Sequence, residues 1–484
     1  MIRFILNNQA IETDLRTGST VLDFVRYHKR LMGTKIGCRE GDCGACTILV
    51  GDIDENDKLV YRSMTSCLMP LGNANGKHIV SVEGINNPME KNGEQVLTPV
   101  QQAMVDANGT QCGFCTIGFV MSFTGFLLDE KANSYEKAVA AIDGNICRCT
   151  GYKSIERAAS IISKLTEEKP GSDTIDWLVK KNFIPSYFSG IKDRLIGLRE
   201  SSETIKNSNG SPEVKVNIGG GTDLIVQRAL SVKKASLQCL YDSTWLKNIY
   251  AEEGVCYIGG SITVTEFAES ELIQDVFPGL SSYIKLISST PIRNMATMAG
   301  NIVNASPIGD MSIFFLALDS SLLLNENGNT RTVKLRDFYK GYKQLDRSPG
   351  EIIEKIIFNL PKPGSFNFEK VSKRIHLDIA SVNSACQLKF SAGSIIEEAH
   401  LSAGGVFAYP KYLSKTANFL TGKKLTKEVI SESINIISEE IAPISDARGT
   451  EEYKRLLLRQ LFLGHLQKLF PSSIEMIKNI LLPA

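Results

Sequence analysis

The sequence predicts an α+β protein of several domains, and three observations support this fold class. The length of 484 residues corresponds to about three domains of ordinary size. Apolar residues make up 43% of the chain and charged residues 22%, which allows packed cores. Segments of alternating apolar and polar residues, typical of strands, share the chain with segments that begin with helix-capping residues.

Composition also excludes several classes of function. The formal charge is +1 and no basic stripe is present, so we expect no nucleic-acid partner. The apolar stretch at the start of the sequence is too short and too polar for a secretory signal. The sequence has no run of 18 apolar residues, so we predict no membrane span. Eight of the 11 cysteines precede Tyr152, which is a metal-site distribution rather than a disulfide framework. We therefore expect a reducing compartment, the cytoplasm.

The first region is predicted to be a small sheet with one helix. Alternating segments indicate strands at residues 3–6, 9–13, 47–50 and 59–64. Ser19 or Thr20 can cap the helix that carries Leu22 and Val25. A cysteine-rich loop lies between this helix and the third strand.

The cysteines of that loop follow the pattern C-x₄-C-x₂-C with a later fourth cysteine, which is the plant-type spacing for a [2Fe–2S] cluster. Each tetrahedral iron, bridged by two sulfides, needs two thiolates. Glycines inside the loop suit a backbone whose N–H groups turn toward sulfur. Unrelated core cysteines or a zinc site are the alternatives. The predicted ligands are Cys38, Cys43, Cys46 and Cys67.

A second cysteine set lies among predicted helices. Thr98, Pro99 and Gln101 predict one helix start, with a capping box and proline in the first turn. Asn133 and Glu136 predict another. A four-cysteine zinc site is the alternative, although such sites usually keep two to four residues between the members of each pair. The second set, C-x₂-C followed by C-x-C, is Cys112, Cys115, Cys147 and Cys149.

A polar linker at residues 164–173, with Pro-Gly inside it, predicts a domain boundary. Beyond it, a strand at 214–218 runs into a glycine-rich turn and a helix start. Successive N–H groups and a helix N-terminus favour a phosphate there. A tight structural turn is the alternative, since the motif is not the dinucleotide pattern G-x-G-x-x-G. The turn consists of Gly219, Gly220, Gly221 and Thr222.

Together these motifs resemble the molybdenum hydroxylase family, which includes xanthine dehydrogenases, aldehyde oxidoreductases and carbon monoxide dehydrogenases. The residues that carry the resemblance are QCGFCT and GNICRCTGY after a module similar to plant-type ferredoxins. The resemblance implies that the second cysteine set also binds a [2Fe–2S] cluster. It also implies that Gln111 lies beside the molybdenum cofactor of a partner.

The resemblance extends to the stretch from Thr290 to Asp310 and implies an FAD site. The glycine turn would hold the pyrophosphate, and the other implied contacts are Thr297, Gly300, Asn301 and Asp310. Asp310 is an acceptor, so it suits a hydroxyl or ring N–H rather than a phosphate. This chain departs from the vertebrate members at one position. They carry an aromatic residue over the flavin near the position where this chain has Ile287.

The implied architecture has four domains. These are a β-grasp [2Fe–2S] ferredoxin domain (1–85), a four-helix [2Fe–2S] domain (86–165), a vanillyl-alcohol-oxidase-like FAD domain (176–362) and a C-terminal α+β domain (366–480). We find no molybdenum domain before the chain ends at Ala484. We therefore expect molybdopterin only in a large partner subunit of a hetero-oligomer.

The function implied by the resemblance is electron transfer in a xanthine dehydrogenase. Electrons would pass from the molybdenum partner through two [2Fe–2S] clusters to FAD and on to NAD. No catalytic residue is expected in this chain, because the organic substrate reacts in the partner. The same role in an aldehyde or other heterocycle hydroxylase is one alternative. A self-sufficient NAD(P)H-dependent electron-transfer flavoprotein is another.

Overall fold

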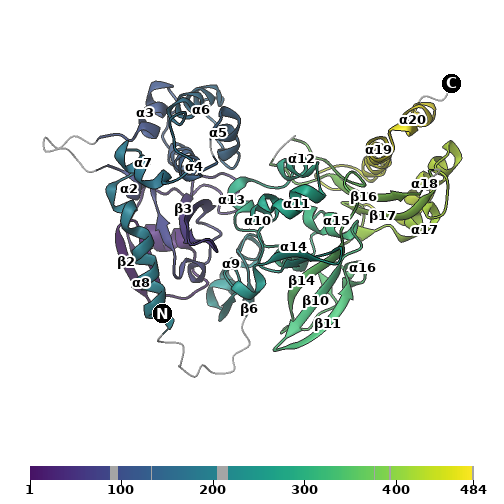
Figure 1. Cartoon of the computed structure of the whole chain (residues 1–484), viewed down its shortest axis with the longest axis horizontal. Coiled ribbons are helices and arrows are strands. Elements are labelled where there is room, and N and C mark those ends of the chain that lie inside the picture. Colours follow the sequence, from purple (N-terminus) through teal and green to yellow (C-terminus); the bar gives the residue numbers. More distant parts are fainter. Residues whose placement is uncertain (88–95, 132, 204–215, 375–376, 392–393, 482–484) are drawn as a thin grey trace. The chain divides into compact units, whose positions relative to one another are not determined.

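The computed structural model describes residues 1–87, 96–131, 133–203, 216–374, 377–391 and 394–481. The chain divides into two compact units, drawn in Figure 1: unit 1 is Met1–Tyr241 with Ser289–Ala296, and unit 2 is Asp242–Ser288 with Thr297–Ala484. Both units mix helices and sheets, which confirms the predicted α+β class. The boundaries of the four predicted domains stay a prediction. Within the described ranges, no helix has the length and apolar character that crossing a membrane requires.

Unit 1 begins with a five-stranded sheet folded around one short helical segment. The strand order is β2-β1-β5-β3-β4, in which β1 and β5 are parallel and the other neighbours antiparallel. Thr20 accepts a hydrogen bond from the Asp23 amide and caps α1 (Val21–Asp23), which continues as a π-helical turn (Phe24–His28). Phe4 and Leu22 are fully buried members of the same core cluster. The strands are β1 (Ile2–Leu6), β2 (Gln9–Thr13), β3 (Thr47–Ile53), β4 (Leu59–Thr65) and β5 (His78–Val80).

A helical module follows in unit 1. The predicted capping box is present. The Gln101 backbone N–H donates to Thr98 Oγ1 at 3.3 Å, and Gln101 Oε1 accepts from the Thr98 backbone N–H at 2.8 Å. The prediction of Asn133 as a cap is wrong by one residue. Ser134, an equally good cap, accepts from the Lys137 amide instead. The helices are α2 (Val82–Ile85), α3 (Pro99–Asp106), α4 (Thr116–Leu128), α5 (Tyr135–Ala141) and α6 (Lys153–Leu165).

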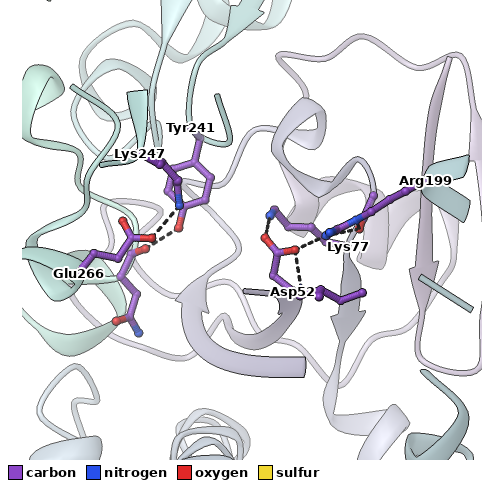
Figure 2. A network of polar contacts seen from close by, with 9 residues as sticks. Asp52, Lys77, Arg199, Tyr241, Lys247 and Glu266 are labelled. Atoms are coloured by element: carbon purple, nitrogen blue, oxygen red, sulfur yellow. Dashed lines mark hydrogen bonds and ion pairs between the residues drawn. The ribbon is translucent and has the colours of Figure 1, made fainter. Parts of the chain in front are cut away.

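The segment after the polar linker packs back onto the preceding elements of unit 1. It contains α7 (Thr174–Lys180), a 3₁₀ turn (Ser186–Gly190) and α8 (Ile191–Glu203). Figure 2 shows Asp52, near the end of β3, accepting hydrogen bonds from two side chains. One is Lys77, just before β5, and the other is Arg199 of α8. This network ties α8 to the sheet.

The remaining elements of unit 1 belong to the region where the glycine turn lies. Strand β6 (Val216–Ile218) runs parallel to β7 (Leu237–Cys239), and α9 (Leu224–Lys234) connects them. The short helix α13 (Thr290–Arg293) also belongs to this unit, although residues 242–288 before it belong to unit 2.

Unit 2 contains an antiparallel sheet of five strands, in the order β11-β10-β14-β9-β8, and one of four, β15-β16-β17-β18. Helix α15 (Asp310–Leu316) packs against β16 and β17, and Phe314 of this helix contacts the rings of Phe267, Phe277 and Phe366. Helix α15 thereby gives Asp310 a rigid support. The strands are β8 (Ile249–Glu252), β9 (Val255–Gly259), β10 (Ser321–Glu326), β11 (Asn329–Lys334), β12 (Tyr339–Gly341), β13 (Gln344–Leu345), β14 (Ile352–Asn359), β15 (Phe366–Val371), β16 (Val382–Phe390), β17 (Ile396–Gly404) and β18 (Lys411–Tyr412).

The other helices of unit 2 cover these sheets. Glu266 completes a capping box with Thr263 and pairs with Lys247 at 2.7 Å, as Figure 2 shows. The helices are α10 (Val264–Glu269), α11 (Glu271–Val276), α12 (Leu280–Lys285), α14 (Met298–Asn304), α16 (Leu335–Phe338), α17 (Ser414–Leu420), α18 (Lys427–Glu440), α19 (Glu451–Leu469) and α20 (Ile474–Leu481).

Candidate cysteine and cofactor sites

Two positions of the first cysteine loop have a backbone that glycine accommodates easily. Gly41 and Gly44 have φ values of +83° and +67°, in the left-handed region. A Cβ on Gly37 would lie 2.6 Å from Cys43 Sγ, so the backbone passes close to sulfur there. The loop thus has the turns predicted for a backbone that wraps a cluster.

The four cysteines of the first set form two pairs. The amides of Glu40 and Cys43 donate to Cys38 Sγ at 3.3 and 3.4 Å, and the Cys38 amide donates to Cys43 Sγ at 3.4 Å. The hydrogen bond from the Cys43 thiol, aided by these amides, lowers the pKa of Cys38 to about 4 and raises that of Cys43. Cys46 and Cys67 form the second, buried pair, in which hydrogen bonding from Cys67 lowers the pKa of Cys46.

Two pairs of thiols with amide donors fit a [2Fe–2S] cluster. Such a cluster places two thiolates on each iron, and amide N–H groups directed at sulfur stabilise thiolate charge. In the described part of the chain, no group of three or more Cys, His, Asp or Glu residues is arranged around a single-ion position. The ligand role of these four cysteines stays a prediction.

The second cysteine set is also paired. Cys112 and Cys149 are exposed, with their sulfurs 3.7 Å apart, and Cys115 hydrogen-bonds to buried Cys147. The Thr150 amide donates to Cys147 Sγ at 3.5 Å, and its hydroxyl oxygen lies 3.1 Å from that sulfur. Burial alone would raise the pKa of Cys147, but these contacts lower it. The second set therefore has the same two-pair arrangement as the first.

The two cysteine loops contact each other directly. The Ile146 amide donates to the Cys43 carbonyl at 3.0 Å, and Asn145 Nδ2 donates to the Gly44 carbonyl at 3.2 Å. Asn145 Oδ1 accepts from Ser122 of α4 at 2.7 Å. Neither Asn145 nor Ile146 is singled out by the sequence, since nothing in the local pattern shows which loop they contact.

The glycine turn lies between β6 and α9, as predicted. A Cβ on Gly220 would lie 1.9 Å from the Met295 carbonyl oxygen, so this position accepts no side chain. Asn73 Nδ2 donates to the Gly219 carbonyl at 2.9 Å, while Asn73 Oδ1 is buried with no hydrogen-bond partner among the residues the structure describes. A close-packed backbone turn at a helix start fits a phosphate, whereas the orphaned acceptor Asn73 Oδ1 suits a ligand donor such as a hydroxyl.

The second predicted FAD-binding stretch begins with α13 in unit 1 and continues from Thr297 as α14 and the start of α15 in unit 2. Thr297 caps α14 by accepting from the Gly300 amide at 3.2 Å. Asn301 Oδ1 accepts from the amide and hydroxyl of Ser312 at 3.3 and 3.4 Å, which orients the Asn301 amide group. These contacts place small polar groups near one another inside unit 2.

Asp310 has two side-chain partners that sequence reasoning missed. Its Oδ2 accepts from Lys370 Nζ at 2.8 Å and its Oδ1 from Asn383 Nδ2 at 2.6 Å. The side chains of Asp310 and Lys370 are 12% and 3% exposed, so Lys370 neutralises a buried carboxylate. A carboxylate has about four acceptor sites, so these two bonds leave room for a ligand hydroxyl.

Comparisons with known proteins agree with this domain series. Residues 4–72 match the 2Fe-2S iron-sulfur cluster binding domain, and residues 81–160 match the [2Fe-2S] binding domain. Residues 198–363 match the FAD binding domain in molybdopterin dehydrogenase, and residues 368–469 match the CO dehydrogenase flavoprotein C-terminal domain.

Similar proteins include two named xanthine dehydrogenases. The xanthine dehydrogenase of Oryza sativa subsp. japonica is 29% identical over 89% of this chain and 36% of its own length. The xanthine dehydrogenase/oxidase of Rattus norvegicus is 27% identical over 98% of this chain and 40% of its own length. A crystal structure of cyanide-inactivated Cu,Mo-CO dehydrogenase is 25% identical over 53% of this chain and 90% of that chain, with a TM-score of 0.50. The chain thus spans 36% and 40% of the length of these two curated relatives.

Proposed function

Because this chain belongs to the molybdenum hydroxylase family and carries its iron–sulfur and FAD-binding domains, we propose that it is the electron-transfer subunit of a xanthine dehydrogenase. The observation that carries the proposal is the contact between two four-cysteine sets, each in two pairs. The Cys43 carbonyl and the Ile146 amide join them by one hydrogen bond of 3.0 Å. Two such sites in contact suit consecutive one-electron carriers.

In this proposal each cysteine set holds one [2Fe–2S] cluster. The amides directed at Cys38 and Cys43, and the hydroxyl beside Cys147, would stabilise the thiolates. The exposed pair Cys112 and Cys149 leaves the second set open toward a partner. We assign the entry of electrons to this second set and their transfer to the first.

We propose further that the glycine turn binds the FAD pyrophosphate, and that α14 and α15 supply polar contacts to the rest of FAD. Bound FAD would accept single electrons and release them in pairs, which suits NAD as the final acceptor. The amides of residues 219–222 would bind phosphate oxygens. Thr297, Gly300 and Asn301 would offer neutral polar groups, and Asp310, held by Lys370, would accept from a hydroxyl or ring N–H.

The partner, the substrate and the acceptor belong to the proposal as well. We propose that a large partner subunit holds molybdopterin and oxidises xanthine, that the two form a hetero-oligomer in the cytoplasm, and that no residue of this chain is catalytic. The names of the rice and rat relatives support xanthine as the substrate. We retain the four domains 1–85, 86–165, 176–362 and 366–480 as the units that carry these roles.

The test is anaerobic purification of the native complex with analysis of its subunits and metals. We expect a larger molybdenum-containing partner, about four iron atoms and one FAD per chain of this protein, and xanthine-dependent reduction of NAD. A complex that contains the partner but turns over an aldehyde or another substrate would contradict the xanthine assignment alone.

The similarity of the C-terminal domain to the CO dehydrogenase flavoprotein favours a second candidate, the same electron-transfer role with another substrate. Substrate screening of the purified complex distinguishes the two. A chain that oxidises NAD(P)H alone, without any partner, would replace both with a self-sufficient flavoprotein.

A further inference from the structure

A segment of eight residues in the FAD-binding region returns to unit 1 after residues 242–288, which belong to unit 2. Residues 198–363 match the FAD binding domain, and within them Ser289–Ala296 packs with the cysteine-bearing unit. Peptide bonds join this segment, here called the insert, to unit 2 at both ends. The insert contains α13 and immediately precedes Thr297.

The insert is anchored to the helical module through Asp143. One carboxylate oxygen of Asp143 accepts from the Thr290 amide at 2.7 Å, and the other accepts from Arg293 Nη2 at 2.7 Å. Arg293 also donates to Thr290 Oγ1 at 2.7 Å, and its side chain is only 12% exposed. Asp143 lies four residues before Cys147, so the anchor is adjacent to the second cysteine set.

The same insert also contacts the first cysteine loop. A Cβ on Gly41 would lie 2.7 Å from Ile292 Cδ1, so Ile292 packs closely on the loop backbone. Asn294 Nδ2 donates to the Ser63 carbonyl of β4 at 2.8 Å. Strand β4 leads directly to Cys67.

The far end of the insert supports the glycine turn. The Met295 carbonyl oxygen would lie 1.9 Å from a Cβ on Gly220, so the two backbones are in close contact. The Asn294 carbonyl accepts from the Tyr241 hydroxyl at 2.6 Å, which holds this end in place. Within eight residues, the insert therefore contacts the first cysteine loop, the segment just before Cys147 and the glycine turn.

We propose that the Asp143–Arg293 ion pair is a positioning device, which holds the insert so that the glycine turn is fixed relative to both cysteine sites. This inference rests on the proposed function, because it assigns a purpose to the insert only if the turn binds FAD and the cysteines bind clusters. Charge-assisted hydrogen bonds in a partly buried site are strong and geometrically specific. Loosening the anchor therefore loosens the turn, which weakens FAD binding and slows transfer from clusters to flavin.

The test compares Asp143→Ala and Arg293→Ala with the wild-type chain, each with both clusters loaded. Three quantities are measured: iron content, the FAD dissociation constant from titration of flavin-free protein, and the rate of flavin bleaching after the clusters are reduced. Both variants should retain full iron, raise the FAD dissociation constant about tenfold and slow bleaching about tenfold, as expected for the loss of a charged hydrogen bond. The matched control is Glu156→Ala, which removes the acidic partner of the exposed Lys153 from the same module.

Conservative variants guard against misfolding. Asp143→Asn keeps an acceptor for Thr290, and Arg293→Lys keeps the positive charge, so each should give an effect of the same sign but about threefold. Wild-type FAD affinity and bleaching rate in all four variants would overturn the inference while leaving the proposed function intact. Loss of iron in parallel with reduced thermal stability, at unchanged FAD affinity, would overturn it in favour of a purely structural pair. A wild-type chain without clusters or flavin would overturn the proposed function itself.

Discussion

The Ile146 amide donates a hydrogen bond to the Cys43 carbonyl at 3.0 Å, so a residue next to one cysteine set is bonded to a member of the other. Asn145, the preceding residue, adds a second link through its side chain to the Gly44 carbonyl. Asn145 is 5% exposed, and Ser122 donates to its other side-chain atom. The relation between the two sites thus depends on one short stretch of buried polar contacts.

Replacing Asn145 with alanine should destabilise unit 1 by about 1–3 kcal/mol, because the Gly44 carbonyl and the Ser122 hydroxyl lose a partner in a buried site. The free energy of unfolding in urea checks this. The matched control is Asn133→Ala, since Asn133 is an exposed asparagine before a helix in the same module. A loss no greater than that of the control would show that the contact contributes nothing to stability.

Replacing Cys43 with serine should abolish one of the two paramagnetic signals of the reduced protein and leave the other. Serine oxygen is a poorer ligand for the iron of a [2Fe–2S] cluster than thiolate sulfur, and Cys43 belongs to one pair only. Cys115→Ser should remove the opposite signal. Cys239→Ser, in β7 outside both sets, should retain both signals. Survival of both signals in Cys43→Ser would contradict the ligand assignment.

Replacing Gly220 with valine should release FAD and spare both clusters. The new Cβ would lie 1.9 Å from the Met295 carbonyl oxygen, which is backbone and cannot move away cheaply. The absorbance ratio of flavin to iron after gel filtration measures the outcome. Gly197→Val in α8, where a Cβ would meet nothing within 4 Å, is the matched control. Full flavin occupancy in Gly220→Val would reject the phosphate-binding role of the turn.

The sequence predicts best those features whose partners are close along the chain. The cysteine patterns, the capping box of Thr98 and Gln101, and the strand before Gly219 are local, since each depends on a few adjacent residues. The Asn133 prediction fails locally for a simple reason: Ser134 is adjacent and caps equally well. The choice between them depends on small differences in the backbone.

The contacts that organise the sites are long-range and have no sequence pattern. Arg293 pairs with Asp143, which is 150 residues away in the sequence, and Lys370 pairs with Asp310, which is 60 residues away. A charged residue looks the same in a sequence whether it is solvated or pairs with a distant buried charge. The sequence therefore predicts Asp310 as an acceptor but not the lysine that neutralises it.

Replacing Asp52 with alanine should destabilise unit 1 by about 2 kcal/mol and loosen α8. Lys77 is only 3% exposed, so loss of the Asp52 carboxylate leaves the buried Lys77 ammonium poorly compensated. Because Asp52 is 37% exposed, the loss of stability stays below the roughly 3–5 kcal/mol of a fully buried pair. Figure 2 shows that Asp52 also binds Arg199 of α8. Urea unfolding and limited proteolysis within α8 measure the two effects.

The control for Asp52 is close by in the same hairpin. Asp57 pairs with Lys192 of α8 but is 72% exposed, so Asp57→Ala should cost less than about 1 kcal/mol. Equal losses from the two alanine variants would show that burial of Lys77 does not set the strength of the network.

His78 should make unit 1 less stable as the pH falls. Its ring is buried, with Nδ1 2.7 Å from the Tyr61 hydroxyl and Nε2 2.8 Å from the Asn7 carbonyl, which corresponds to a neutral ring protonated on Nε2. Burial lowers the pKa of His78 from 6.5 to about 3. Between these values the unfolded chain binds a proton that the folded chain does not. Stability is therefore complete above pH 6.5 and declines toward pH 3.

At pH 5 this loss amounts to about 2 kcal/mol, because 1.5 pH units below the unfolded pKa correspond to about 1.4 kcal/mol each. His78→Gln removes the titrating ring, so its unfolding free energy should fall by about 2 kcal/mol less than that of wild type between pH 7.5 and pH 5. His28→Gln, the same substitution at an exposed position, is the matched control. Urea titrations of the three proteins at both pH values give the comparison. An equal change in unfolding free energy between pH 7.5 and pH 5 in all three would mean that the His78 ring is already protonated in the folded protein at pH 5.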